Sequence, residues 1–137
     1  MAIRIEAIDH VVLRVRDSAR VEAFYREVLG CAVERRREDL GLIQLRAGRS
    51  LIDLVDVAGP LGSQGGAAPE KDGRNMDHLA LRIEPFDEAD LRAHLQAHGV
   101  EVGEVATRFG AEGDGPSMYI TDPEGNTVEL KGPPDQG

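Results

Sequence analysis

The sequence predicts an α+β fold built from two copies of a β-α-β-β-β module. The first observation is a repeated strand: Asp9-His10-Val11-Val12-Leu13-Arg14-Val15 returns half a chain later as Asp77-His78-Leu79-Ala80-Leu81-Arg82-Ile83. The second is an amphipathic helix pattern, ended by glycine, that follows each copy. A repeat this long indicates a duplicated unit, so we expect the two halves to share one topology.

Module one is expected over residues 5–57. Residues 5–15 are the expected first strand, in which Val11, Leu13 and Val15 form an apolar face opposite His10 and Arg14, as in a half-buried strand. A helix should follow over residues 18–29, with Asp17 or Ser18 as its N-cap. Three short strands complete the module, separated by turn-prone residues, at 31–36, 40–46 and 50–57.

A segment rich in glycine and proline, residues 58–75, connects the two modules. It contains few apolar residues and is longer than ordinary connections, which is typical of linkers and lids. We favour a plain linker as the interpretation of this segment, and a functional lid is the alternative.

Module two is expected over residues 76–131, with a strand to Ile83, a helix over 87–97 and a strand over 100–107. A glycine-rich loop at 110–116 should form a rim beside the site. The turn Asp122-Pro123-Glu124-Gly125 then predicts a hairpin between strands 117–121 and 127–131. Residues 132–137 are expected to be a tail, so that residues 1–137 form a single domain.

Length, charge and cysteine content narrow the class of protein. A chain of 137 residues is about one domain and needs no disulfide or metal in order to fold. Its formal charge of −9 argues against nucleic acid and anionic membranes as partners and leaves a small molecule as the expected one. A single cysteine, Cys31, and the lack of a long apolar run predict a cytoplasmic protein.

Two histidines and two carboxylates occupy matching places in the modules. Strand alternation puts His10 and His78 on the polar face of each first strand, and Asp53 and Glu129 lie in each last strand. Two imidazoles and two carboxylates make a mixed site that suits Zn²⁺, Ni²⁺, Co²⁺, Mn²⁺ or Fe²⁺. The alternative is structural: histidines satisfied within the fold, and carboxylates paired with Arg14 or Arg82.

The chain resembles the vicinal oxygen chelate superfamily, which includes glyoxalase I, extradiol dioxygenases and bleomycin resistance proteins. The resemblance covers almost the whole chain. It is carried by the two Asp-His strands, by the helix end Phe24-Tyr25-Arg26-Glu27-Val28-Leu29-Gly30, and by Tyr119-Ile120-Thr121-Asp122-Pro123-Glu124-Gly125-Asn126-Thr127-Val128-Glu129-Leu130. It implies a cupped, mostly antiparallel sheet around a divalent metal, and a homodimer.

The resemblance also implies roles for individual residues. His10, His78 and Glu129 match three of the family's metal ligands. Asp53 stands where glyoxalase I-like members carry a glutamate and, being one methylene shorter, is expected to reach the metal directly or through water. In a metal-dependent lyase or isomerase of the glyoxalase I type, Glu129 would move a proton next to a carbonyl while Asp53 is the opposed carboxylate.

Other functions remain open. His10, His78 and Glu129 also satisfy the ligand set of an Fe²⁺ ring-cleaving dioxygenase, although the remaining histidines, His94 and His98, are expected on an exposed helix surface. Thiol transfer to fosfomycin ranks low because residues 132–137 contain no arginine or lysine. A drug-binding protein without a metal is the non-enzymatic alternative. Arg108, Ser117 and Tyr119 are candidate substrate contacts.

Overall fold

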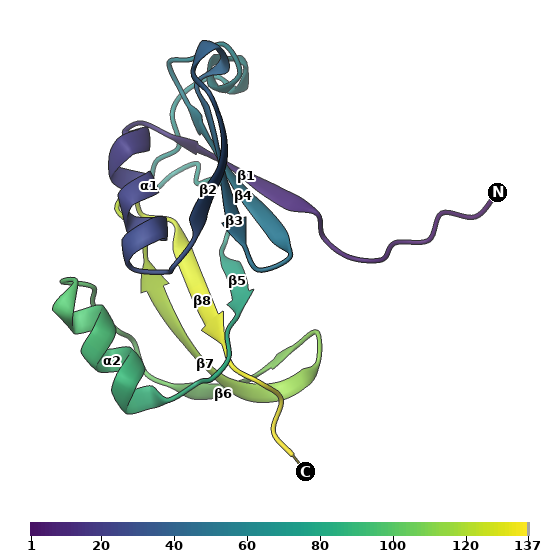
Figure 1. The fold of residues 1–137 in the computed structure, drawn as a ribbon, viewed down its shortest axis with the longest axis vertical. Coiled ribbons are helices and arrows are strands. Elements are labelled where there is room, and N and C mark those ends of the chain that lie inside the picture. Colours follow the sequence, from purple (N-terminus) through teal and green to yellow (C-terminus); the bar gives the residue numbers. More distant parts are fainter. Residues whose placement is uncertain (137) are drawn as a thin grey trace. The chain divides into compact units, whose positions relative to one another are not determined.

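The computed structural model describes residues 1–136, which form two compact units. Unit 1 is Met1–Pro69 and unit 2 begins at Glu70, so the boundary lies inside the predicted linker. Each unit contains one four-stranded sheet and one α-helix, in the order β-α-β-β-β (Figure 1). The predicted α+β class and the repeated topology are therefore confirmed.

Unit 1 orders its strands β1-β4-β3-β2, with β1 parallel to β4 and the other neighbours antiparallel. A 3₁₀ turn, η1 (Glu38–Leu40), joins β2 to β3. The elements are β1 (His10–Val15), α1 (Ser18–Glu27), β2 (Ala32–Arg37), β3 (Leu42–Ala47) and β4 (Ser50–Asp56).

The core of unit 1 lies between α1 and one face of this sheet. Asp17 caps the helix by accepting a hydrogen bond from the backbone of Arg20 at 3.1 Å, as predicted. The helix buries Val21 and Tyr25 completely. The strand residues that complete the core are at most 2% exposed; they are Leu13, Val15, Leu45, Ile52 and Leu54.

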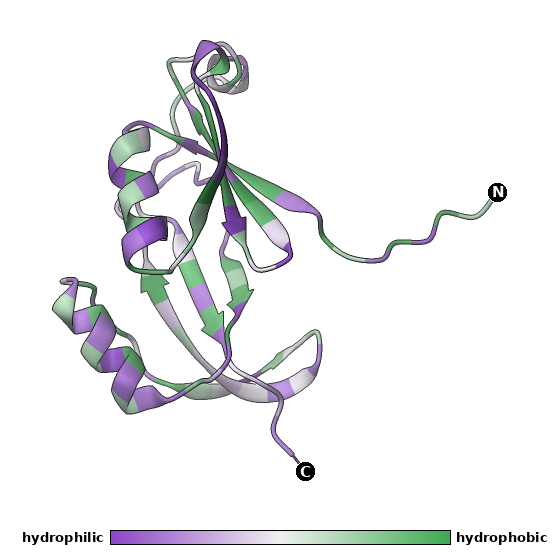
Figure 2. Ribbon diagram, viewed as in Figure 1, coloured by the Kyte–Doolittle hydropathy of each residue, from purple (hydrophilic) through white to green (hydrophobic). Residues whose placement is uncertain are grey.

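Unit 2 repeats the arrangement with the order β5-β8-β7-β6 and β5 parallel to β8. Hydrophobic and hydrophilic positions alternate along β8 (Figure 2), so one face joins the core and the other is polar. Leu95 of α2 is buried with strand residues of the first face, such as Met118 and Val128. The elements are β5 (Leu79–Arg82), α2 (Glu88–Ala97), β6 (Ala106–Gly110), β7 (Gly113–Thr121) and β8 (Thr127–Lys131).

Several expected strands begin or end elsewhere. The strand expected over 76–83 is β5, Leu79–Arg82, so His78 lies just before the strand and not within it. The first strand begins at His10, and residues 1–9 lie outside the sheet. The strand expected at 100–107 is instead β6, Ala106–Gly110, and the predicted rim loop 110–116 is mostly the start of β7. Glycine suggested a loop there, but a Cβ at Gly115 would lie 2.5 Å from the Pro133 carbonyl oxygen. The glycine is needed because the chain after β8 passes close to β7.

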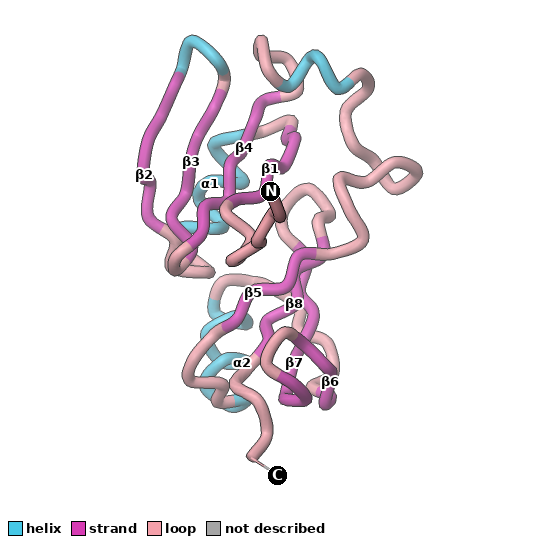
Figure 3. Tube along the Cα trace, turned by 90° about the vertical axis from the view of Figure 1, so that its right-hand side faces the viewer, coloured by secondary structure: helices cyan, strands magenta, loops and turns pink. Residues whose placement is uncertain are grey.

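The first half of the 58–75 segment is attached to unit 1 and contains a 3₁₀ turn, η2 (Gly62–Gly65), visible in Figure 3. Arg14 of β1 donates four hydrogen bonds of 2.7–3.1 Å to the carbonyl oxygens of Gly62, Gly66 and Ala67. A Cβ at Gly65 would lie only 2.5 Å from Arg14 Nε. Residues 62–67 are therefore not the plain linker that we expected, because Arg14 holds them against unit 1.

Within the described part of the chain, neither α-helix has the length and apolar character needed to span a bilayer.

Candidate functional site

One face of the unit 1 sheet, opposite α1, carries both candidate ligands of module one. Asp53 of β4 is in register with Val12 of β1, and His10 lies two residues before Val12 on the same side of that strand. Asp53 is 5% exposed, whereas His10 is exposed. We call this side, defined by His10, Arg14, Gln44 and Asp53, the polar face of unit 1.

Gln44 of β3 holds the Asp53 carboxylate. Its Nε2 donates to the two Asp53 oxygens at 3.2 and 3.3 Å, and its Oε1 accepts a 2.8 Å hydrogen bond from Arg35 Nε. Because Arg35 can only donate, it fixes the amide so that Nε2 points to Asp53. The buried carboxylate is thus oriented by a donor on the neighbouring strand.

The aspartate before His10 fixes the state of its ring. His10 Nδ1 lies 2.8 Å from Asp9 Oδ1, and this hydrogen bond, followed by the charge of Asp53, raises the pKa of His10. An ionised carboxylate only accepts, so Nδ1 carries the proton. In the neutral imidazole the lone pair is then on Nε2, which leaves that atom available as a ligand.

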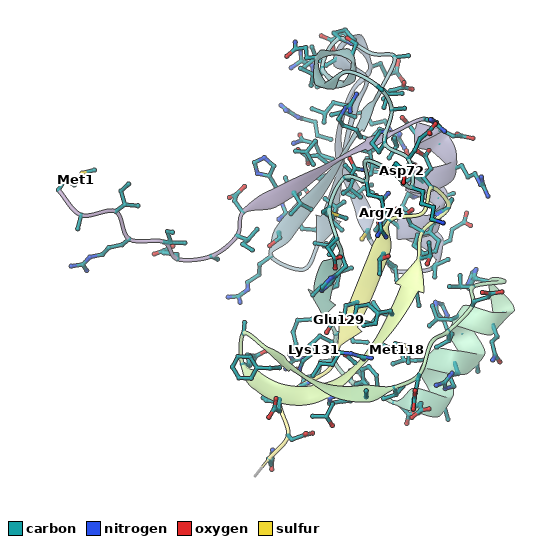
Figure 4. All side chains as sticks on the ribbon, turned by 180° about the vertical axis from the view of Figure 1, so that it is seen from behind. Met1, Asp72, Arg74, Met118, Glu129 and Lys131 are labelled. Atoms are coloured by element: carbon teal, nitrogen blue, oxygen red, sulfur yellow. The ribbon has the colours of Figure 1, made fainter. Side chains whose placement is uncertain are left out.

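Unit 2 repeats this pairing and adds a direct contact. His78 Nδ1 lies 2.6 Å from Asp77 Oδ2, and the hydrogen bond lowers the pKa of Asp77. His78 Nε2 lies 3.3 Å from Glu129 Oε1. We call the side of the unit 2 sheet that carries Glu129, Tyr119, Arg108 and Lys131 the polar face of unit 2; Figure 4 shows Glu129 and Lys131 along β8.

The His78–Glu129 pair fits a divalent cation. Glu129 is 6% exposed, and His78 Nε2 is the only basic nitrogen within 4.0 Å of its carboxylate among residues 1–136. With Asp77 holding the Nδ1 proton, a lone pair faces a carboxylate oxygen, which is favourable only with a proton or a cation between them. Two ligand atoms each about 2.1 Å from a metal lie roughly 3.0–3.4 Å apart, so the separation of the two atoms is suitable.

Tyr119 and Arg108 extend the polar face of unit 2 beyond Glu129. The Tyr119 ring meets the His78 ring edge to face at 5.4 Å, and the Arg108 guanidinium lies 4.6 Å from the Tyr119 ring centroid. Burial, and then the charge of Glu129, raises the pKa of the Tyr119 hydroxyl, while Arg108 opposes this shift. Arg108 Nη1 also donates to the carbonyl oxygen and Oγ of Ser117, each at 2.8 Å.

The structure therefore brings one predicted histidine and one predicted carboxylate to the polar face of each unit. The alternative partners of the carboxylates are engaged elsewhere: Arg14 binds the 62–67 backbone, and Arg82 pairs with Glu112 at 2.6 Å. Inside neither unit do three or more His, Cys, Asp or Glu side chains gather, over residues 1–136. The four-ligand set that combines both modules stays a prediction.

Some site residues were missed at the level of sequence. Asp9 and Asp77 could have been found, because an Asp-His dipeptide opens both repeated strands. Gln44 and Lys131 carry no such signal, since their roles depend on strand register. The expected exposure of His94 and His98 is confirmed; His94 lies on α2 and His98 is the C-cap residue that follows it.

Comparison with known proteins agrees with this architecture. A family model described as Glyoxalase/Bleomycin resistance protein/Dioxygenase superfamily matches residues 7–130. The chain is similar to the glyoxalase domain-containing protein RDO1 of Mycosarcoma maydis, with 28% identity over 92% of this chain and 68% of that protein.

Two solved structures share the fold along nearly their whole length. The integron cassette protein VCH_CASS1 from V. cholerae gives a TM-score of 0.74 at 26% identity, over 96% of this chain and 98% of that one. A lactoylglutathione lyase from Agrobacterium tumefaciens gives 0.64 at 26% identity, over 93% and 94% of the two chains.

Proposed function

The chain belongs to the Glyoxalase/Bleomycin resistance protein/Dioxygenase superfamily, and from this membership we propose that it is a metal-dependent lyase or isomerase of the glyoxalase I type. Its substrate would be a small α-oxo compound or a hemithioacetal. The observation that carries the proposal is the His78–Glu129 pair, in which a buried carboxylate faces the ligand atom of a histidine at 3.3 Å. That pair supplies both a metal ligand and a base.

His10, Asp53, His78 and Glu129 are the proposed ligands of a divalent ion, one of Zn²⁺, Ni²⁺, Co²⁺, Mn²⁺ or Fe²⁺. When bound, such an ion supplies a Lewis acid that stabilises negative charge on substrate oxygen. The donor set of imidazole nitrogen and carboxylate oxygen suits these ions. Asp9 and Asp77 orient the two rings by accepting their Nδ1 protons.

Glu129 is the proposed catalytic base. It would remove the proton from the carbon beside the substrate carbonyl and return it to the neighbouring carbon. Its 6% exposure keeps water from competing for that proton. Asp53, held by Gln44 at 3.2 and 3.3 Å, is the proposed opposed carboxylate.

The first prediction tests this role. Replacing Glu129 by glutamine should lower kcat by about 10²–10⁴-fold, the range expected for loss of a general base. The measurement is turnover of the methylglyoxal–glutathione hemithioacetal by protein reconstituted with Ni²⁺ or Zn²⁺, together with metal content. The matched control is His98→Gln at the exposed C-cap of α2, which should turn over as the unmodified protein does.

The same preparations separate the competing functions. An Fe²⁺ ring-cleaving dioxygenase would retain iron and consume oxygen with catechols, whereas an isomerase consumes none. A drug-binding protein would hold its ligand without metal. If metal content stays near zero after reconstitution, both enzyme proposals fail.

We also propose that the protein is a cytoplasmic homodimer that acts on a small molecule. The support for the dimer is the N-terminal segment, residues 1–9, which exposes Ile3, Ile5 and Ile8. Cytoplasmic location rests on the single cysteine, Cys31, which is half-buried; burial raises the pKa of its thiol.

A further inference from the structure

Two cationic side chains on the polar face of unit 2 have no carboxylate partner among residues 1–136. Arg108 of β6 contacts Ser117 and Tyr119, and Lys131 of β8 contacts backbone carbonyls. Over residues 1–136, no carboxylate oxygen lies within 4.0 Å of either cation, whereas Arg82 on the same face pairs with Glu84 and Glu112. In a chain of net charge −9, two cations on one face of a sheet without a carboxylate among the described residues need an explanation.

Lys131 is buried with weak hydrogen bonds. It is 8% exposed, and its Nζ lies 3.4 Å from the Gly113 carbonyl oxygen and 3.5 Å from that of Gly132. Good N–H···O bonds are about 2.7–3.2 Å long. A buried ammonium ion with long contacts to neutral acceptors is costly unless a negative charge comes close to it.

Two glycines make room for this lysine. A Cβ at Gly115 would lie 2.9 Å from Lys131 Nζ, and one at Gly110 would lie 3.2 Å from its Cε. The lysine side chain therefore crosses β7 at Gly115, the residue that is in register with Arg108. Both cationic side chains therefore lie over β7 on the same face of the sheet, Lys131 at Gly113 and Gly115 and Arg108 at Ser117 and Tyr119.

Arg108 is held rigidly and keeps donors available. Nη1 is fixed by the Ser117 carbonyl oxygen and by Ser117 Oγ, both at 2.8 Å, and Ser117 is completely buried. The guanidinium has five N–H donors, and no other hydrogen bond to it is formed within residues 1–136. A fixed guanidinium with free donors is well suited to carboxylate or phosphoryl oxygens.

We propose that Arg108 and Lys131 form a binding site for an oxyanionic group of the substrate, a carboxylate or a phosphoryl group. This inference rests on the proposed function and specifies its substrate: a small α-oxo or α-hydroxy compound that carries an acidic group. Tyr119 is in register with Glu129 and contacts Arg108, so it spans the distance between the base and the cations. Arg108 contacts the anion, and Lys131 adds positive charge on the same face of the sheet.

The test is a calorimetric titration of the full chain, in EDTA, with phosphonoacetate, succinate and neutral succinamide. Both anions, or one of them, should bind and succinamide should not. Arg108→Met should weaken anion binding at least tenfold, and Lys131→Met should weaken it as well. Arg92→Met is the matched control, because Arg92 lies on α2 and pairs with Glu88; it should bind as the unmodified protein does.

The outcomes are separable from those of the proposed function. A preference for phosphonoacetate identifies a phosphoryl group, and equal or better binding of succinate identifies a carboxylate. Anion binding that is absent, or unchanged in Arg108→Met, overturns the proposal; if Lys131→Met does not fold, Arg108→Met decides alone. Because the titration uses metal-free protein, anion binding with no metal uptake would leave this site standing and reject the metal enzyme.

Discussion

Two aspartates decide which atoms the candidate histidines present. Asp9 and Asp77 accept from Nδ1 at 2.8 and 2.6 Å, so Nε2 of each ring is the basic atom. In His78 that atom faces Glu129. A histidine without such a partner could place its proton on either nitrogen, and half of the neutral rings could then present N–H where a ligand is required.

This pairing leads to a prediction on metal affinity. Asp77→Ala removes the acceptor of the Nδ1 proton, and loss of such a partner typically lowers metal affinity by about 10–100-fold. Competition with a chromophoric chelator for Zn²⁺ measures the change. Asp72→Ala, at an exposed position of the same unit, is the control. Equal affinity in Asp77→Ala and the unmodified protein would show that Asp77 does not act through His78.

Glu22 of α1 is a buried carboxylate that forms ion pairs with two arginines of unit 1. It is 7% exposed and binds the Arg36 guanidinium through both oxygens, with Nη2 at 2.8 Å from Oε2, while Arg26 Nη1 lies 3.3 Å away. The Arg36 hydrogen bonds are the main reason that the pKa of Glu22 is lowered. The contact ties the helix to β2.

Replacing Glu22 by glutamine should lower the free energy of unfolding by about 1–2 kcal/mol at pH 7, because hydrogen bonds to charged groups are strong but both arginines are half exposed. A lowered folded-state pKa contributes stability above the unfolded value, about pH 4.3, and loses it as pH falls through the folded value. The difference from the unmodified protein should therefore shrink below about pH 4.3. Urea unfolding at several pH values measures it; a constant difference would contradict the assignment.

At the scale of elements, η2 and the residues beside it are the clearest case of ordered structure that the amino-acid composition did not predict. Glycine and proline over residues 58–75 suggested a linker, since no apolar pattern indicated packing. Arg14 supplies the missing interaction by binding three backbone carbonyls, and Gly65 permits the close approach. Because Arg14 is on the polar face of unit 1, the segment it holds lies at the edge of that face.

Arg14→Gln should therefore release residues 62–67. Loss of charged hydrogen bonds to three carbonyls should raise amide hydrogen exchange in this segment about tenfold or more, with β3 and β4 unchanged. Exchange mass spectrometry measures it peptide by peptide. Gly65→Ala should act in the same direction, because the added Cβ would lie 2.5 Å from Arg14 Nε. Arg20→Ala on the exposed side of α1 is the control; equal exchange in all variants would mean that the segment is held by other contacts.

At the scale of the molecule, the duplication made most of the fold predictable. Strand alternation placed His10, and the matching last strands placed Asp53 and Glu129, on the polar faces that the structure shows, whereas His78 precedes β5 and is placed by its contact with Glu129. What could not be predicted depends on contacts between residues distant in sequence. Gln44 meets Asp53 only through strand register, and Lys131 crosses β7 only because Gly115 has no side chain. The alternation of apolar and polar residues predicts the face of the sheet on which a residue lies. It does not predict which residues lie beside it on neighbouring strands.

The N-terminal segment, residues 1–9, supports the proposed homodimer. It extends away from β1 in Figure 1 and exposes Ile3, Ile5 and Ile8 by 84%, 87% and 74%. It continues β1, which is at the end of the strand order of unit 1. Extended apolar segments beside a strand edge tend to pair with another chain, and each isoleucine that becomes buried contributes about 1.5–3 kcal/mol.

We expect a second copy of the chain to cover these isoleucines. Ile3→Ser combined with Ile5→Ser removes two apolar side chains from each copy, which should raise the dimer dissociation constant by at least about tenfold. Sedimentation velocity over a range of concentrations measures it. Arg4→Ser, between the two on the opposite side of the extended segment, is the matched control and should leave the dissociation constant within about threefold.

Because residues 1–9 lie outside both sheets, neither variant should change the unfolding midpoint of a monomer, so a lost dimer cannot be attributed to misfolding. A monomer at every concentration, or a double variant that dimerises as tightly as the unmodified chain, would reject this contact.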